Sequence, residues 1–208
     1  MRKKTIALAA LAVAGTLTLA ACGGNDSMGN MPGMGSSSTS SSPTSSSDAM
    51  SDFNDADVTF ATEMIPHHRQ AVAMAKLADT RAESQQVKDL AMQIMNAQDP
   101  EIQTMSGWLT AWGKPVPSDD TSMGGMDMGG DSSMAGMMSG ADMDKLKKAS
   151  GADFDQMFLT MMIAHHQGAI EMAKTEETNG MNADAIALAQ QIQTAQASEI
   201  TTMNGLLK

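Results

Sequence analysis

The chain contains one segment twice, and this duplication limits its possible folds more than any other feature. Residues 57–109 align with residues 155–207 without a gap, at an offset of 98, with 24 identities in 53 positions. Chance does not produce an ungapped match of this quality. The two copies are therefore expected to fold alike and to form a fold with internal symmetry.

Each copy shows the apolar periodicity of two consecutive helices. In the first helix, apolar residues and a histidine recur at intervals of three and four residues, which is the spacing of one helical face. This face consists of Phe60, Met64, His67, Ala71 and Met74. The second helix is expected from about residue 84 to 112, and its face comprises Val87, Ala91, Ile94, Gln98, Glu101, Met105, Trp108 and Trp112. Neither copy has the alternating pattern of a strand.

Two helical hairpins, each with one apolar face, bury those faces best against each other. The predicted fold is therefore all-α: a four-helix bundle with approximate two-fold symmetry, with the first hairpin at residues 53–113 and the second at 143–208. Pro66 lies inside the first predicted helix, where it removes a hydrogen bond and is expected to kink the helix just before His67. The second copy has Ala164 there, so the two histidine pairs need not be equivalent.

The first 21 residues have the pattern of a secretory signal peptide. Arg2, Lys3 and Lys4 precede an apolar stretch over residues 5–21, which is too short for a stable membrane-spanning helix. The stretch ends at Cys22, the single cysteine, in a sequence typical of a bacterial lipobox, whose cysteine is acylated, for instance with palmitate, and becomes the mature N-terminus. The alternative is an ordinary cleaved signal followed by a chance cysteine. We expect a lipoprotein anchored in the cell membrane and facing its extracytoplasmic side.

One segment of low complexity precedes the first hairpin, and another lies between the two hairpins. Residues 22–52 are rich in Ser, Thr and Pro and cannot bury enough apolar area to offset the entropy of ordering, so they are expected to form a disordered tether. Residues 114–142, rich in Gly, Met, Asp and Ser, are expected to link the hairpins. The chain has 24 acidic and 13 basic residues, a net charge of −11, which argues against a nucleic-acid partner because phosphate binding depends on Lys and Arg.

All four histidines stand in two adjacent pairs, His67-His68 and His165-His166. Adjacent helical residues point about 100° apart, so one pair cannot easily hold a single ion from one regular helix. His67 and His165 share their faces with methionines and are expected to be the primary metal ligands, while the second histidine of each pair is a further ligand or faces the other hairpin. The predicted metal-site residues are His67, His68, Met64, Met74, Glu101 and Met105 in the first copy, and His165, His166, Met162, Met172, Glu199 and Met203 in the second.

The ligand types indicate which metal such a site would prefer. Imidazole and thioether together favour copper, especially Cu(I), with another transition metal as the alternative. A di-iron carboxylate bundle uses Glu on several helices and Glu-x-x-His motifs. Glu63, one turn before His67, has Met161 as its counterpart, which argues against a ferroxidase-type centre. The simpler interpretation is that the histidines are hydrogen-bonded core residues and that the methionines only pack.

Methionine is also concentrated in the two low-complexity segments, in Met-x-x-Met and Met-Gly-Gly-Met runs. These runs resemble the disordered Met-rich stretches of copper transporters and periplasmic copper proteins. We interpret them as sites of loose copper capture, and a flexible linker of biased composition is the alternative. The residues are Met28, Met31, Met34, Met123, Met126, Met128, Met134, Met137, Met138 and Met143.

The run from Met64 to Ala75, followed by Gln98-x-x-Glu101-Ile102-x-x-Met105, resembles the bacterial domain-of-unknown-function 305 family. The second copy fits as closely over residues 162–173 and 196–200, and the resemblance covers about residues 52–208. It implies an exported, ferritin-like four-helix fold, and some members of that family are linked to copper binding and copper tolerance. Ala164 departs from the usual Pro of the family, so the resemblance does not define the geometry of the second site.

These features predict a membrane-tethered protein that binds, buffers or delivers copper outside the cytoplasm. We do not expect an enzyme, because no catalytic constellation of Ser, Cys or carboxylate residues is evident. Two alternatives are a ferritin-like metal-dependent oxidoreductase and a non-metal helical interaction module of the cell envelope. The expected partners are a metal ion and the membrane, together with a second copy of the chain or a copper-handling envelope protein.

Overall fold

The computed structural model describes residues 52–118 and 134–208. The fold of these ranges is all-α, as predicted, with short turns and connections between the helices. No strand occurs in them; a single-residue bridge joins Ala82 to Gly151. The predicted signal peptide, Cys22 and the tether up to residue 51 lie outside the described residues, as do Met28, Met31, Met34, Met123, Met126 and Met128 of the Met-rich runs. Within the two described ranges, no helix is long and apolar enough to cross a membrane. The helices are α1 (Asp55–Arg81), α2 (Gln85–Ala111), α3 (Gly140–Lys148), α4 (Gly151–Asn179) and α5 (Ala183–Leu206).

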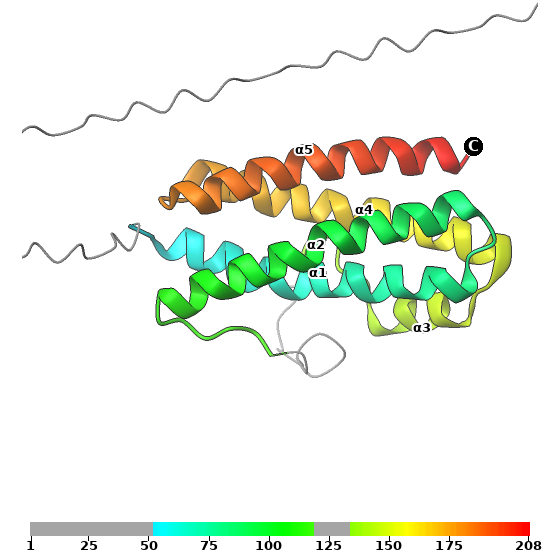
Figure 1. Ribbon diagram of the computed structural model, residues 1–208, viewed down its shortest axis with the longest axis horizontal. Helices are drawn as coiled ribbons and strands as arrows, with labels where there is room; N and C mark the ends of the chain where they lie inside the picture. Colours follow the sequence, from blue (N-terminus) through cyan, green and yellow to red (C-terminus); the bar gives the residue numbers. More distant parts are fainter. Residues whose placement is uncertain (1–51, 119–133) are drawn as a thin grey trace, which may run out of the picture. The chain divides into compact units, whose positions relative to one another are not determined.

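The helices form the two predicted hairpins, α1 with α2 and α4 with α5, which pack side by side (Figure 1). Contact between the hairpins runs mainly through α1 and α4, the two helices that carry the histidine pairs. α1 continues without interruption through Pro66, whose side chain is buried. Pro66 therefore does not end α1, which is one helix on both sides of the proline.

Two separate apolar clusters fill the bundle. One cluster joins the C-terminal half of α1 to the N-terminal half of α4 and includes Met74 and Phe158. The other joins the N-terminal half of α1 to the C-terminal half of α4 and includes Met64 and Ala173. α1 and α4 are thus antiparallel neighbours. Their histidines stand midway along each helix and occupy the layer between the two clusters.

The short helix α3 was not predicted from the sequence, where residues up to 142 were interpreted as linker. Ser139 caps this helix by accepting a hydrogen bond from the amide of Asp142 at 3.1 Å. Met143 and Leu146 are buried in the first of the two apolar clusters. This packing explains why a nine-residue segment of low intrinsic hydrophobicity is helical here.

An aspartate at the start of each hairpin, fully buried in the case of Asp57 and half-buried in the case of Asp155, caps the second helix of the other hairpin. Asp57 accepts hydrogen bonds from the amides of Met181 and Asn182, at 3.1 and 2.9 Å, just before α5. Its repeat equivalent, Asp155, accepts from the amides of Glu83 and Ser84, at 3.1 and 2.8 Å, just before α2. These reciprocal contacts tie the hairpins together and satisfy amides that a helix cannot satisfy itself.

Asp57 also faces the buried side chain of Glu176, which has Ala78 as its repeat equivalent. Burial raises the pKa of Glu176 to about 8, and a hydrogen bond to Asp57 and the charge of Asp57 add to this effect. Burial by itself would raise the pKa of Asp57, but hydrogen bonds from Glu176 and from backbone amides outweigh it, and the net shift is downward. The raised pKa favours the protonated form of the Glu176 carboxyl, which can share its proton with Asp57.

The Glu176→Gln variant is expected to change the pH dependence of stability. A raised folded-state pKa contributes stability that is fully present below the ordinary pKa of 4.5 and lost as pH rises through about 8. Glutamine keeps a donor for Asp57 at every pH. Relative to the variant, the wild type should therefore lose about 2 kcal/mol between pH 5 and pH 9 in urea denaturation. The exposed Glu171→Gln serves as control, and parallel curves for wild type and Glu176→Gln would contradict the shared proton.

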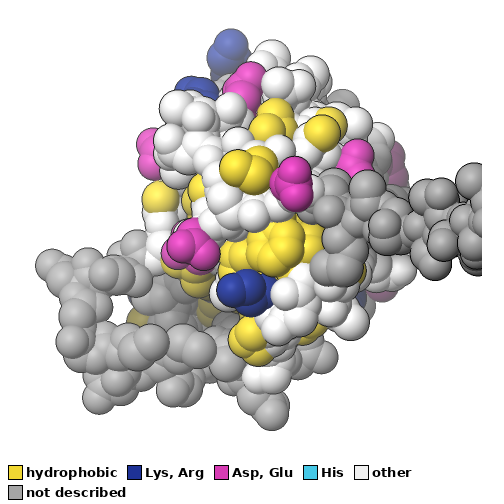
Figure 2. Space-filling view, turned by 90° about the vertical axis from the view of Figure 1, so that its left-hand side faces the viewer, with side chains coloured by type: hydrophobic (Ala, Val, Ile, Leu, Met, Phe, Trp, Pro, Cys, Tyr) yellow, Lys and Arg dark blue, Asp and Glu magenta, His cyan; other side chains and the backbone are white. Residues whose placement is uncertain are grey.

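One end of the bundle exposes apolar surface. Figure 2 looks at the end where α1 begins and α2 finishes, and hydrophobic side chains gather there among acidic ones. Phe53 stacks on Trp112, with ring centroids 4.8 Å apart, and Trp112 in turn lies 6.1 Å from Trp108. Stacked rings cover the open end of the second apolar cluster.

Candidate metal site

The four histidines are all fully buried, with 0% of their surface exposed. His67 of α1 and His165 of α4 face each other, with ring centroids 3.7 Å apart and ring planes inclined by 38°. The two positions are equivalent under the repeat. The predicted primary ligands therefore meet at the interface between the hairpins, in one shared location instead of two separate ones.

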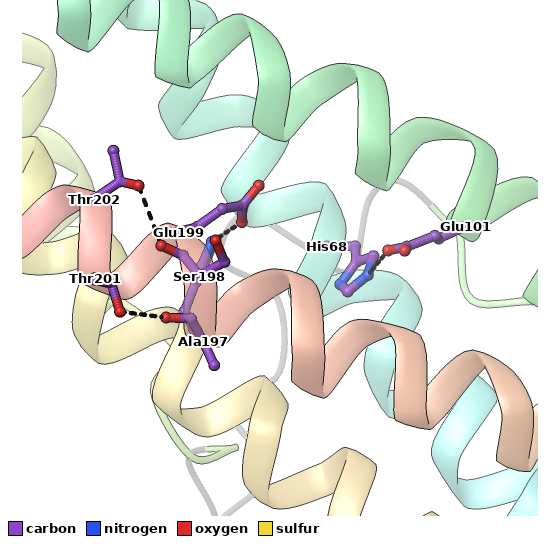
Figure 3. A network of polar contacts seen from close by, with 8 residues as sticks. His68, Glu101, Ala197, Ser198, Glu199, Thr201 and Thr202 are labelled. Atoms are coloured by element: carbon purple, nitrogen blue, oxygen red, sulfur yellow. Dashed lines mark hydrogen bonds and ion pairs between the residues drawn. The ribbon is translucent and has the colours of Figure 1, made fainter. Parts of the chain in front are cut away.

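The second histidine of each pair binds a glutamate within its own hairpin. The Nε2 of His68 donates to Glu101 at 2.7 Å, and the two side chains point toward each other from α1 and α2 (Figure 3). In the other hairpin, the Nε2 of His166 donates to Glu199 at 2.6 Å. Both predicted glutamates thus contact imidazole, which satisfies a carboxylate in an otherwise apolar face.

His67 has a different partner, which comes from the segment between the hairpins. Its Nε2 donates to the backbone carbonyl oxygen of Ala135 at 3.2 Å. Gln70, one turn along α1, binds the same segment twice: its Nε2 donates to the carbonyl of Met138 at 2.9 Å, and its Oε1 accepts from the amide of Met138 at 2.7 Å. Ala135 and Gln70 were not among the residues predicted from the sequence. The one available signal was the repeat, in which Gln70 is replaced by Gly168.

The remaining ring nitrogens are buried without partners. The Nδ1 atoms of His67, His68 and His166 have no hydrogen bond, and neither nitrogen of His165 has one. In the three histidines whose Nε2 donates a proton, Nδ1 carries the free lone pair. Buried polar atoms are almost always paired, so a group of bare nitrogens in one layer requires an explanation.

Burial keeps the inner histidines neutral. It lowers the pKa of His67 to about 3, assisted by the neighbouring His68, while the hydrogen bond to Ala135 acts in the opposite direction. Burial likewise lowers the pKa of His165 well below its usual value, and the proximity of His67 adds to this effect. Both imidazoles are therefore unprotonated at neutral pH, which is the state that a metal ligand requires.

The predicted methionine ligands divide between the two apolar clusters. Met64 and Met105 belong to one cluster, and Met74, Met162 and Met203 to the other, all with 0% exposure. Met172 is half-buried and packs against the cluster that contains Met64 and Met105. Gln98, one turn before Glu101 on α2, is also buried, and both polar atoms of its side chain lack partners.

Within residues 52–118 and 134–208, no three His, Cys, Asp or Glu side chains converge as a metal-binding group. A purely nitrogen- and oxygen-ligated centre of the zinc or di-iron type therefore does not match the described arrangement. The donor types that α1 and α4 do supply are imidazole and thioether, since His67 and His165 each have a fully buried methionine, Met64 and Met162, one turn earlier on the same helix.

Comparison with known proteins gives the same family over most of the chain. Residues 57–207 match the family described as Domain of unknown function (DUF305). Among proteins with curated descriptions, none matches this chain.

Several solved structures are similar to the chain in fold and sequence. A putative secreted DUF305 protein from Streptomyces coelicolor is 36% identical, with a TM-score of 0.64, over 73% of this chain and 91% of that one. CopM in the Cu(I)-bound form is 33% identical, with a TM-score of 0.59, over 72% and 94%. CopM in the Cu(II)-bound form is 35% identical, with a TM-score of 0.61, over 73% and 95%.

Proposed function

Because this chain belongs to the DUF305 family and its structural relatives include copper-bound CopM, we propose that it binds copper in the histidine layer between α1 and α4. The observation that carries this proposal is the common state of His67, His68 and His166. In each, an oxygen acceptor holds Nε2 while Nδ1 is bare. Metal-ligating histidines characteristically use one nitrogen for the ion and donate the other N–H to a carboxylate or carbonyl.

The donors available favour Cu(I) as the ion. Two facing imidazoles, His67 and His165, offer nitrogen, and fully buried methionines occur on the same helices within one turn of them. Sulfur of the thioether type binds soft ions and needs no deprotonation. In this proposal, Glu101 and Glu199 orient histidines and are not themselves ligands.

The proposed role is buffering or delivery of copper on the outer side of the cell membrane. Support for the location comes from the sequence pattern of a secretory signal and the lipobox-like sequence that ends at Cys22, which lie outside the described residues. Support for binding over turnover is the full burial of all four histidines, which leaves no solvent-exposed position beside them in this arrangement.

Titration of the full chain with Cu(I) against a competing chelator, followed by X-ray absorption spectroscopy, tests this function. The expected result is tight binding of Cu(I), with both nitrogen and sulfur scatterers around the ion, and weaker binding of Zn(II) in a parallel titration. Coordination by sulfur alone would place the copper in the Met-rich segments and contradict the histidine site. Oxygen-dependent turnover of Cu(I) or Fe(II) would instead support an oxidoreductase.

A further inference from the structure

Residues 134–138, here called the strap, lie across the histidine layer. The strap contacts His67 through the carbonyl of Ala135 at 3.2 Å, and Gln70 holds its other end through two hydrogen bonds to the backbone of Met138. An amide side chain that both donates to and accepts from one residue reproduces the pairing of a neighbouring strand, and it fixes backbone position in two directions.

On its other side, the strap touches the backbone of α4. Gly136 has φ +78°, and a Cβ atom built on it would lie 2.5 Å from the carbonyl oxygen of Ala164. A Cβ atom on Gly168 would lie 1.8 Å from the carbonyl oxygen of Ala135. Only glycine permits this approach at both positions, since a side chain at either one would displace the strap.

The repeat shows that these contacts are a departure from symmetry. Gln70 and Gly168 are equivalent positions in the two copies, and they differ in complementary ways. In the first copy, the long amide reaches the strap and binds it. In the second copy, the absence of a side chain leaves the space in which the strap lies. One feature of the tertiary structure, the strap, thus accounts for both residues.

We propose that the strap is a latched cover over the copper site, and that Gln70 and Gly168 are positioning residues that set how fast an ion enters and leaves. This inference rests on the proposed function. His67 and His165 have no exposed surface, so some part of the protein must move before an ion can reach them. α1 and α4 are held by extensive apolar packing on both sides of the layer, whereas the strap is held over it by three hydrogen bonds and the partly buried side chain of Met138.

The strap also determines which nitrogen of His67 is offered to the ion. While the carbonyl of Ala135 accepts the proton of Nε2, the lone pair of His67 stands on Nδ1. Lifting the strap removes this acceptor and leaves the choice of tautomer open. His166 provides an internal reference, because its Nε2 is held by Glu199 and does not depend on the strap.

The experiment compares Gln70→Leu and Gly168→Ala with wild type in the full chain. Leucine nearly conserves the volume of glutamine and removes both hydrogen bonds, while alanine at position 168 displaces the strap from the opposite side. Gln167→Leu, on the exposed face of α4, is the control. Both test variants should raise amide hydrogen exchange at Met138 and change the ¹⁵N shifts of His67 but not of His166. They should speed Cu(I) transfer to a chelator about 10-fold, the effect expected for losing such hydrogen bonds.

The outcomes separate this inference from the proposed function. If Met138 exchanges faster in both variants while the rate of Cu(I) transfer is unchanged, the strap does not control access, although copper binding stands. If the Met138 amide stays protected in Gln70→Leu, Gln70 is not the latch and the inference is overturned. If wild type takes up no Cu(I), the proposed function fails first, and the role of the strap toward an ion fails with it.

Discussion

Replacing His67 and His165 together with alanine should weaken Cu(I) binding by at least about 100-fold, because residues that only orient metal ligands already contribute 10- to 100-fold. The two imidazoles lie at the centre of the hairpin interface, with ring centroids 3.7 Å apart, and the ring of His165 also packs beside that of His166. The measurement is a competition titration of the full chain with a Cu(I) chelator.

A control must separate the loss of ligands from the loss of packing. Ile94 and Ile192 occupy equivalent positions of the repeat, are at most 1% exposed and carry no donor atom. The Ile94→Ala, Ile192→Ala double variant therefore creates one cavity in each hairpin, as the histidine variant does, without removing a metal ligand. It should bind Cu(I) within a few-fold of wild type. Equal affinities for the histidine variant and this control would show that copper binds elsewhere in the chain.

Asp57→Ala should be the most destabilising single substitution among the polar residues discussed here, by about 3–5 kcal/mol. Asp57 is fully buried and accepts hydrogen bonds from the amides of Asn54 at 2.6 Å, Met181 at 3.1 Å and Asn182 at 2.9 Å. Alanine leaves these amides without this acceptor and removes the carboxylate that faces Glu176. Urea denaturation followed by circular dichroism measures the change in free energy of unfolding.

The repeat supplies the matched variant for this prediction. Asp155 caps the opposite hairpin through two amides but has no acidic partner, because Ala78 stands where the other copy has Glu176. Asp155→Ala should therefore cost only about 1–2 kcal/mol, which is the usual range for a lost helix cap. If both substitutions cost the same, the contact between Asp57 and Glu176 contributes nothing to the bundle.

The helical fold could be predicted because its signals are local. A spacing of three and four residues places Phe60, Met64 and His67 on one face whatever surrounds them, and the repeat shows that this face occurs twice. Amphipathic faces of equal length then pair most simply as a bundle. Asn54 and Asp57 form a capping box at the start of α1, which is a contact between residues only three apart in the sequence.

The strap and α3 could not be predicted because their sequence has no periodicity. Residues 134–142 share the Gly, Met, Asp and Ser composition of the rest of the linker, and composition of this kind indicates a flexible segment. What orders them is contact with distant residues, namely Gln70, Gly168 and the apolar cluster that receives Leu146. Such contacts exist only once the hairpins have come together.

The duplication by itself determined two helical hairpins, an all-α bundle and the position of a histidine pair at the middle of one helix in each hairpin. Only the tertiary structure decided that His67 meets His165, that His68 and His166 turn to glutamates within their own hairpins, and that a strap closes over His67. The reason is physical. Helical periodicity fixes which face a residue lies on, but the partner across an interface depends on how two helices are aligned, which is set by packing along their whole length.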